Sequence, residues 1–335
     1  MFFNALNFLS KLTIRKLFNF LKLVISYFLF RGLKKHLILG LPTSLSIEPT
    51  TSCNLFCPEC QSGLRKFLRN TGMININIYS KIIDEMGSFL TYLNLYFQGE
   101  SYLHPDFFSL VKYANKNHLY TATSTNAHFL NEENAKKTIE SGLDRLIISI
   151  DGTTQEIYGI YRVGGKLNNV IDGTKNILKW KKELKSKKPY VIFQFMVFKQ
   201  NQHQIKDVKQ LGNELGVDKV VIKSAQISDF KNGNLFIPTI DKFSRYKENK
   251  NGTYTIKNKL KNHCWRLWSS SVISWDGKVV PCCFDKDAQH QMGDIRHDSF
   301  KRIWDNKIYW KFRKQVFQSR RKIKICNNCI EGMKN

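Results

Sequence analysis

Apolar and polar positions alternate between two patterns along residues 43–224. Short apolar runs, of strand length and rich in β-branched residues, are separated by longer stretches whose apolar positions recur every three or four residues. The pattern predicts strands at 44–48, 91–97, 119–124, 145–150, 190–198 and 219–223. It predicts helices between them at 76–90, 106–117, 131–141, 167–184 and 202–215, with Asn131 as an N-cap.

This order of elements predicts the fold class. Strands that alternate with helices form parallel βα units. Six units are too few to close an eightfold barrel. We therefore expect an α/β fold, a partial and open (β/α)6 barrel, with its ligand site at the carboxyl ends of the strands.

The rest of the chain departs from this alternation. Residues 225–262 are polar and rich in Lys and Asn, so we interpret them as a connector. Residues 263–332 are a second, short module with a hairpin turn signal at 275–278 and an amphipathic helix at 299–310. The expected domains are therefore an N-terminal segment at 1–41, a barrel at 43–224, the connector, and the module at 263–332.

The N-terminal segment at 1–41 contains seven basic residues and no acidic ones. Its apolar stretches are too short to span a bilayer. Two interpretations remain open. An amphipathic helix with a basic face would lie in a membrane interface, whereas a helix of the same pattern could pack on the body of the protein. No secretory cleavage site follows, so we expect a cytoplasmic protein, with peripheral recruitment to the inner face of the membrane under the first interpretation.

Composition adds a statement about partners. The 335 residues are 42% hydrophobic and 13% aromatic, which provides a packed core and excludes wholesale disorder. Lys and Arg number 53 against 27 Asp and Glu, a net charge of +26. Such a surplus predicts attraction to an anion: nucleic acid, a lipid surface or an acidic substrate.

The eight cysteines form two groups. Disulfide frameworks belong to short secreted chains, so in a long chain of a reducing compartment two tight groups indicate metal or iron–sulfur ligation. The first group is Cys53, Cys57 and Cys60, and the second is Cys264, Cys282, Cys283, Cys326 and Cys329. Three thiolates on one loop hold three corners of a [4Fe–4S] cluster and leave the fourth iron open to another ligand.

The first group, with three and then two residues between its cysteines just after the first predicted strand, resembles the radical SAM superfamily. Further segments at or after strand ends resemble that family: Gln98-Gly99-Glu100, Ser124-Thr125-Asn126, Ser149-Ile150-Asp151-Gly152 and Arg162. The resemblance implies that Cys53, Cys57 and Cys60 bind a [4Fe–4S] cluster. It also implies that S-adenosyl-L-methionine (SAM) is bound by Gly99, Glu100, Thr125, Asn126, Ser149, Asp151 and Arg162.

Two residues depart from the family's pattern. Gln98 replaces the first glycine of its Gly-Gly-Glu segment. Glu59 stands where the family usually has an aromatic residue near the adenine, so the adenine contact stays unassigned.

The second module resembles the SPASM/twitch extension of radical SAM enzymes, in the short form with one auxiliary cluster. The resemblance implies an auxiliary [4Fe–4S] cluster on Cys264, Cys282, Cys326 and Cys329. Cys283 is left over, because adjacent side chains on an extended segment face opposite sides. Zinc on four thiolates remains the alternative for this site.

The implied activity is that of a radical SAM oxidoreductase. Such an enzyme cleaves SAM reductively to a 5′-deoxyadenosyl radical, which abstracts hydrogen from a substrate. One auxiliary cluster suits a two-electron oxidation, a dehydrogenation or a peptide modification. The expected partners are an unknown peptide or small-molecule substrate and a one-electron reductant such as flavodoxin or ferredoxin. No catalytic residue is named by the sequence.

Two other functions remain open. An RNA-modifying radical SAM enzyme would use the positive charge, including ten Lys and Arg at 301–324, but no RNA-binding module is recognisable and nucleic acid is not the expected partner. A non-catalytic iron–sulfur or zinc-binding protein would require the matches at Glu100, Ser149 and Asp151 to be accidental.

Overall fold

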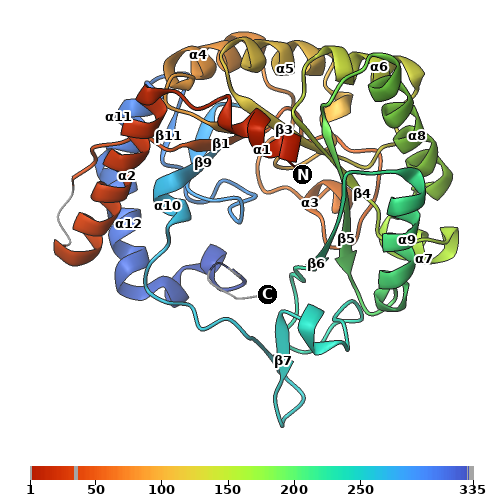
Figure 1. Ribbon diagram of the computed structural model, residues 1–335. Helices are drawn as coiled ribbons and strands as arrows, with labels where there is room; N and C mark the ends of the chain where they lie inside the picture. The colour runs from red at the N-terminus through yellow and green to blue at the C-terminus, as the bar shows by residue number, and fades with distance from the viewer. Residues whose placement is uncertain (1, 34–36, 330, 332–335) are drawn as a thin grey trace.

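An open barrel of parallel strands is the centre of the molecule (Figure 1). The computed structural model describes residues 2–33, 37–329 and 331. Neighbouring strands pair in parallel in chain order, from the first to the sixth. They are β1 (Ser44–Ile47), β2 (Tyr92–Asn94), β3 (Tyr120–Thr125), β4 (Arg145–Ser149), β5 (Tyr190–Val197) and β6 (Lys219–Ser224). The predicted partial (β/α)6 barrel is confirmed.

Helices cover the outer face of this sheet (Figure 1). They are α4 (Ile76–Met86), α5 (Phe107–Lys116), α6 (Glu132–Glu140), α7 (Gln155–Tyr161), α8 (Leu167–Glu183) and α9 (Ile205–Leu215). The short α3 (Gln61–Leu64) lies instead at the carboxyl ends of the strands. Short 3₁₀ turns lie at Ser101–Leu103 and Gln202–Gln204. Asn131 caps α6 as predicted, since its side chain accepts a hydrogen bond from the Asn134 amide at 2.8 Å. The helix predicted at 76–90 ends earlier, at Met86, directly before Gly87.

The C-terminal module continues the same sheet. Strand β9 (Ser270–Ile273) pairs in parallel with β1, and β10 (Lys278–Val280) returns antiparallel to β9. The predicted turn between them is present, with Gly277 at a φ of 85°. The sheet ends at β11 (Gly293–Asp294), so nine strands run in the order β11-β10-β9-β1-β2-β3-β4-β5-β6.

The helix predicted at 299–310 is two helices. They are α11 (Phe300–Trp304) and α12 (Lys307–Ser319). The break comes where the Asn306 side chain accepts a hydrogen bond from the Tyr309 amide at 2.8 Å and so starts the second helix. The module also contains α10 (Arg266–Ser269) and 3₁₀ turns at Arg320–Lys322 and Lys324–Cys326.

The segment at 225–262 has structure of its own. It forms a 3₁₀ turn at Asp241–Phe243 and a hairpin of β7 (Tyr246–Glu248) and β8 (Tyr254–Ile256). Ile227, Ile237 and Tyr246 are buried in one apolar cluster with Cys57 of the barrel. Strands of three residues are too short to give a readable alternation, which is why the sequence showed only polar composition here.

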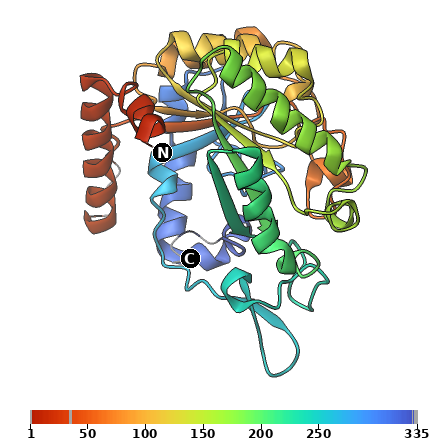
Figure 2. The same ribbon diagram turned by 45° about the vertical axis from the view of Figure 1, so that its right-hand side comes forward.

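The N-terminal segment forms two helices, α1 (Phe2–Leu9) and α2 (Ile14–Leu33). Helix α1 contacts the starts of the barrel strands, where Asn7 Nδ2 donates to Asp144 Oδ1 at 2.9 Å. Helix α2 lies on the outside of the C-terminal module (Figures 1 and 2). Its Phe30 ring lies 5.0 Å from Trp268 and 5.1 Å from Phe317, so this face packs on the body of the protein.

The opposite face of α2 is apolar and exposed. Its exposed large side chains recur at helical spacing: Ile14, Leu17, Phe18, Leu21, Ile25 and Phe28. Among the described residues, no helix has the length and apolar character needed to cross a membrane.

Candidate active site

One cavity of about 260 Å³ lies at the carboxyl ends of the barrel strands. Its walls come from the loop after β1, from the ends of β2, β3, β4 and β5, and from the end of α7. Nine of the residues predicted for the SAM site line it: Cys53, Cys57, Cys60, Gly99, Glu100, Thr125, Asn126, Ser149 and Arg162. The tenth, Asp151, does not line it.

Two of the three cysteines of the first group, Cys53 and Cys57, lie close to polar side chains. Asn126 Nδ2 lies 3.9 Å from Cys53 Sγ, and Arg162 Nη1 lies 3.8 Å from Cys57 Sγ. Burial raises the pKa of Cys53 to about 11, so the free thiol keeps its proton at neutral pH. Metal ligation therefore releases that proton. Burial also raises the pKa of Cys57, and the nearby Arg162 cation partly opposes that rise.

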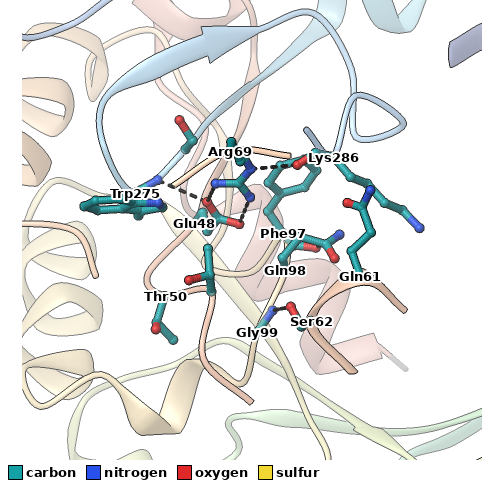
Figure 3. Close-up of polar contacts among 12 residues, drawn as sticks. Glu48, Thr50, Gln61, Ser62, Arg69, Phe97, Gln98, Gly99, Trp275 and Lys286 are labelled. Carbon is teal, nitrogen blue, oxygen red and sulfur yellow. Dashed lines mark hydrogen bonds and ion pairs between the residues drawn. The ribbon is translucent and has the colours of Figure 1, made fainter. Parts of the chain in front are cut away.

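Gly99 occupies a position that only glycine fits. Its φ is 74°, and a Cβ there would lie 2.3 Å from the Thr50 carbonyl oxygen. The Gly99 amide donates to Ser62 Oγ at 2.8 Å, as Figure 3 shows. This bond ties the strand-end segment to helix α3, which directly follows Cys60.

Glu100 is a buried carboxylate at the cavity wall, with an exposed fraction of 2%. It accepts a hydrogen bond from the Asn126 amide at 2.7 Å. Burial raises its pKa to about 7, and the hydrogen bond from Asn126 partly opposes that rise. The carboxylate is thus held in place and changes charge near neutral pH.

Asp151 lies behind Arg162. Its carboxylate accepts hydrogen bonds from Arg162 Nε and from the Met196 amide, both at 2.7 Å, and it is fully buried. Burial raises the pKa of Asp151, while the Arg162 cation and the Met196 amide oppose the rise. The geometry gives Asp151 the task of orienting Arg162, whose guanidinium faces the cavity.

The lining residues fit the groups that the sequence implied. Three thiols face one side of the cavity. Glu100 and the buried Gln98 Oε1, which has no hydrogen-bond partner among the described residues, are acceptors for an ammonium group. Arg162 is a donor for a carboxylate. An iron–sulfur cluster with an amino-acid ligand on its open iron matches this donor set.

A second cavity gathers four cysteines of the C-terminal module: Cys264, Cys282, Cys326 and Cys329. Its other walls are mainly apolar, and Arg320 Nη2 donates to Cys329 Sγ at 3.2 Å. Cys283 does not line this cavity, and it shares with Cys282 the lining of a different one. In the described part of the chain, no three His, Cys, Asp or Glu side chains meet at a point that could hold a single metal ion.

A buried ion pair joins the two cysteine regions (Figure 3). Arg69, after the first cysteine loop, donates to both carboxylate oxygens of Glu48 at 2.8 and 2.6 Å. From the C-terminal module, the Trp275 amide donates to Glu48 at 3.2 Å and the Lys286 carbonyl accepts from Arg69 Nε at 2.7 Å. No spacing in the sequence marks this cluster, because Glu48, Arg69 and their partners Trp275 and Lys286 come from four separate segments.

Comparison with known families agrees with this geometry. The radical SAM superfamily model matches residues 47–212, and the SPASM model, an iron–sulfur cluster-binding domain, matches residues 264–330. The chain belongs to the radical SAM superfamily. It is therefore a radical SAM enzyme that uses SAM and a [4Fe–4S] cluster, and its SPASM domain is an auxiliary iron–sulfur cluster-binding domain. The non-catalytic alternative is excluded by this membership.

Curated relatives of this radical SAM enzyme modify cofactors and peptides. It is 26% identical to the tungsten-containing aldehyde ferredoxin oxidoreductase cofactor-modifying protein of Pyrococcus furiosus, over 80% of this chain and 82% of that protein. It is 27% identical to the PqqA peptide cyclase of Bradyrhizobium diazoefficiens, over 72% of this chain and 67% of that protein.

Solved structures share its fold. Streptococcus suis SuiB bound to S-adenosylmethionine has a TM-score of 0.65 at 15% identity, covering 89% of this chain and 74% of SuiB. BtrN in complex with AdoMet and 2-DOIA has a TM-score of 0.55 at 19% identity, covering 87% of this chain and 94% of BtrN.

Several residues that line the SAM-site cavity were not predicted from the sequence motifs. Ser62, Tyr96, Tyr161 and Met196 also face the SAM-site cavity, and Asn126 Nδ2 donates to Asn54 at 2.7 Å. Strand periodicity could have found Met196, because Gln194 and Ile192 on the same strand also face the barrel interior.

Glu59 has a structural partner outside the cavity. It accepts a hydrogen bond from the Ser228 amide at 2.7 Å and so fixes the segment that follows β6.

Proposed function

We propose that this enzyme holds its [4Fe–4S] cluster on Cys53, Cys57 and Cys60. Asp151 acts through Arg162. The remaining residues of the site, which line the cavity, hold SAM: Gly99, Glu100, Thr125, Asn126, Ser149 and Arg162. The observation that carries this assignment is that three thiols, one buried carboxylate and one guanidinium face a single cavity at the strand ends.

The bound cluster supplies one electron for the cleavage of SAM. The chain's own residues orient the ligand. Glu100 and Gln98 accept hydrogen bonds from the amino group of SAM, and Arg162 donates to its carboxylate, held at the correct angle by Asp151. The buried walls exclude water from the site, and Tyr161 and Met196 belong to those walls.

The proposed overall reaction is a two-electron oxidation of a peptide, assisted by the auxiliary cluster and by a reductant such as flavodoxin or ferredoxin. Support for a peptide comes from the PqqA peptide cyclase relative and from the shared fold of SuiB, which was solved bound to the precursor peptide SuiA. Support for transfer of the second electron from the substrate to the auxiliary cluster comes from the lining of the barrel interior. Tyr96 and Phe97 line both the SAM-site cavity and the cavity that contains Cys282 and Cys283.

Binding of SAM is expected to depend on pH. Burial raises the pKa of Glu100 to about 7, so the carboxylate that accepts from the SAM amino group is lost as the pH falls. Affinity should fall roughly tenfold between pH 8 and pH 6, since ionisation at a pKa near 7 changes by that factor. Equilibrium dialysis of the reconstituted enzyme with labelled SAM measures this. Glu100→Gln should bind SAM weakly at both pH values. An unchanged profile in that variant would remove Glu100 from the SAM site.

Iron content tests the auxiliary site. Reconstituted enzyme should contain about 8 iron atoms per chain, because two [4Fe–4S] clusters are bound. Cys282→Ser should lower this to about 4, whereas Cys283→Ser, the matched neighbour, should keep about 8. Cys282→Ser should still cleave SAM but no longer turn over substrate. About 4 iron atoms with one zinc in the wild type would refute the auxiliary-cluster proposal.

Membrane recruitment is the second proposal about this chain, and the exposed stripe of α2 supports it. That stripe runs from Ile14 to Phe28, with Arg15, Lys22 and Arg31 on the same helix and no acidic residue in it. A basic and apolar helix surface is suited to the interface of an anionic bilayer.

Replacing Phe18 and Leu21 together by Glu should weaken sedimentation with phosphatidylglycerol vesicles more than tenfold, because two side chains lose burial worth about 1.5–3 kcal/mol each. Leu235→Glu, at a position that is also exposed but distant in sequence, is the control and should not change vesicle binding. Equal binding of the wild type and the double variant would refute recruitment through α2.

A further inference from the structure

The barrel interior next to the SAM-site cavity is lined by positive charge. Two more cavities open there, of about 470 and 270 Å³. Arg266 lines the larger one, and Arg145, Lys219 and Lys223 line the smaller one. No Asp or Glu is among the residues that line either cavity.

These cavities adjoin one another. Arg145 of the smaller cavity donates from Nη1 to the Tyr92 hydroxyl of the larger cavity at 3.3 Å. Tyr96 lines both the larger cavity and the SAM-site cavity. The two cavities and the SAM-site cavity therefore follow one another along the barrel interior.

The cations have few partners to neutralise them. Arg266 pairs with Glu331 at 2.7 Å, and Arg145 stacks over Tyr92 and Tyr120 while its Nε is buried without a hydrogen bond. The side chain of Lys223 is exposed in the smaller cavity and has no hydrogen-bond or ion-pair partner among the described residues. Desolvation by the cavity walls lowers the pKa of Lys223, and the nearby cations Arg266, Arg245 and Arg145 lower it further.

A structural explanation covers only part of this pattern. Inward-pointing lysines protect an edge strand from pairing with another chain, and Lys219 and Lys223 lie on β6 at the edge of the sheet. Arg145 lies on β4, between β3 and β5, where no edge needs protection. A cleft of one sign of charge concentrates ligands of the other sign.

We propose that the substrate is an acidic peptide whose side-chain carboxylate binds Arg145 and Lys223 in the barrel interior. The proposal rests on the peptide substrate proposed above. The carboxylate would supply an acceptor for the Arg145 guanidinium, whose Nε has no hydrogen-bond partner, and an ion-pair partner for the exposed Lys223 ammonium in the same cavity. The residue to be oxidised then lies between this anchor and the SAM-site cavity.

The test uses the full-length reconstituted enzyme with SAM and a fluorescein-labelled peptide of alternating Glu and Ser. Fluorescence anisotropy gives the dissociation constant. Lys223→Glu should weaken binding at least tenfold, and Arg145→Gln should weaken it as well. Lys209→Glu makes the same change of charge at an exposed position of α9 and should leave binding within twofold. A control peptide with Gln in place of each Glu should bind weakly to the wild type and to all three variants.

Three outcomes would overturn the proposal. Equal weakening by Lys209→Glu would mean general attraction to a basic chain, and no weakening by Lys223→Glu would leave that lysine with edge protection only. Displacement of the peptide by glutarate at equal concentration would identify a small carboxylic acid as the ligand. Formation of 5′-deoxyadenosine by the wild type, measured in parallel, tests the SAM chemistry separately.

Discussion

Replacing Cys57 by Ala is expected to abolish formation of 5′-deoxyadenosine from SAM with dithionite. Cys57 is one of only three thiols that face the SAM-site cavity. A cluster that already lacks a fourth protein ligand is lost when one of three is removed. The iron content should fall from about 8 to about 4 atoms per chain, because the auxiliary site is separate.

The measurement is chromatographic quantification of 5′-deoxyadenosine under anaerobic conditions, together with iron analysis. Cys283→Ala is the matched control. It also removes one thiol, and Cys283 lines neither the SAM-site cavity nor the cavity of the auxiliary cysteines. It should keep 5′-deoxyadenosine formation. Product from Cys57→Ala at the wild-type rate would show that the open cluster is bound elsewhere.

The barrel was predictable because its strands carry a strong local signal. Strand β4 contains the apolar run Leu146–Ile148, and its observed bounds, Arg145–Ser149, differ from the predicted 145–150 by one residue. Strand β2 is shorter than predicted, Tyr92–Asn94 in place of 91–97, because the chain beyond it turns to form the wall of the SAM-site cavity. The β-propensity of the residues cannot show where a strand stops pairing with its neighbouring strands.

The parts that the sequence missed depend on contacts between distant segments. Strand β9 pairs with β1, although more than two hundred residues separate them. The orientation of Asp151 toward Arg162 likewise follows only from the folded turn of α7. Motif spacing brought Asp151 and Arg162 to the same region but could not say which of them faces the ligand.

The Glu48–Arg69 pair gives the second large effect. Arg69→Met should destabilise the protein by about 3–5 kcal/mol, because it leaves a fully buried carboxylate without its counter-ion. The urea midpoint, followed by tryptophan fluorescence under anaerobic conditions, measures this loss. Lys137→Met breaks the exposed pair with Glu133 and is the control, with a change below about 0.5 kcal/mol.

The charge of Glu48, and not the shape of Arg69, should carry most of that loss. Burial raises the pKa of Glu48 even with Arg69 present. Without Arg69 the pKa rises further, so the loss relative to the wild type should shrink as the pH falls, because Glu48 of the folded variant binds a proton at a higher pH than Glu48 of the folded wild type. Glu48→Gln combined with Arg69→Met should therefore recover at least half of the stability. A double variant as unstable as Arg69→Met alone would mean that the guanidinium acts through its bond to the Lys286 carbonyl, and that this bond holds the SPASM domain against the cysteine loop.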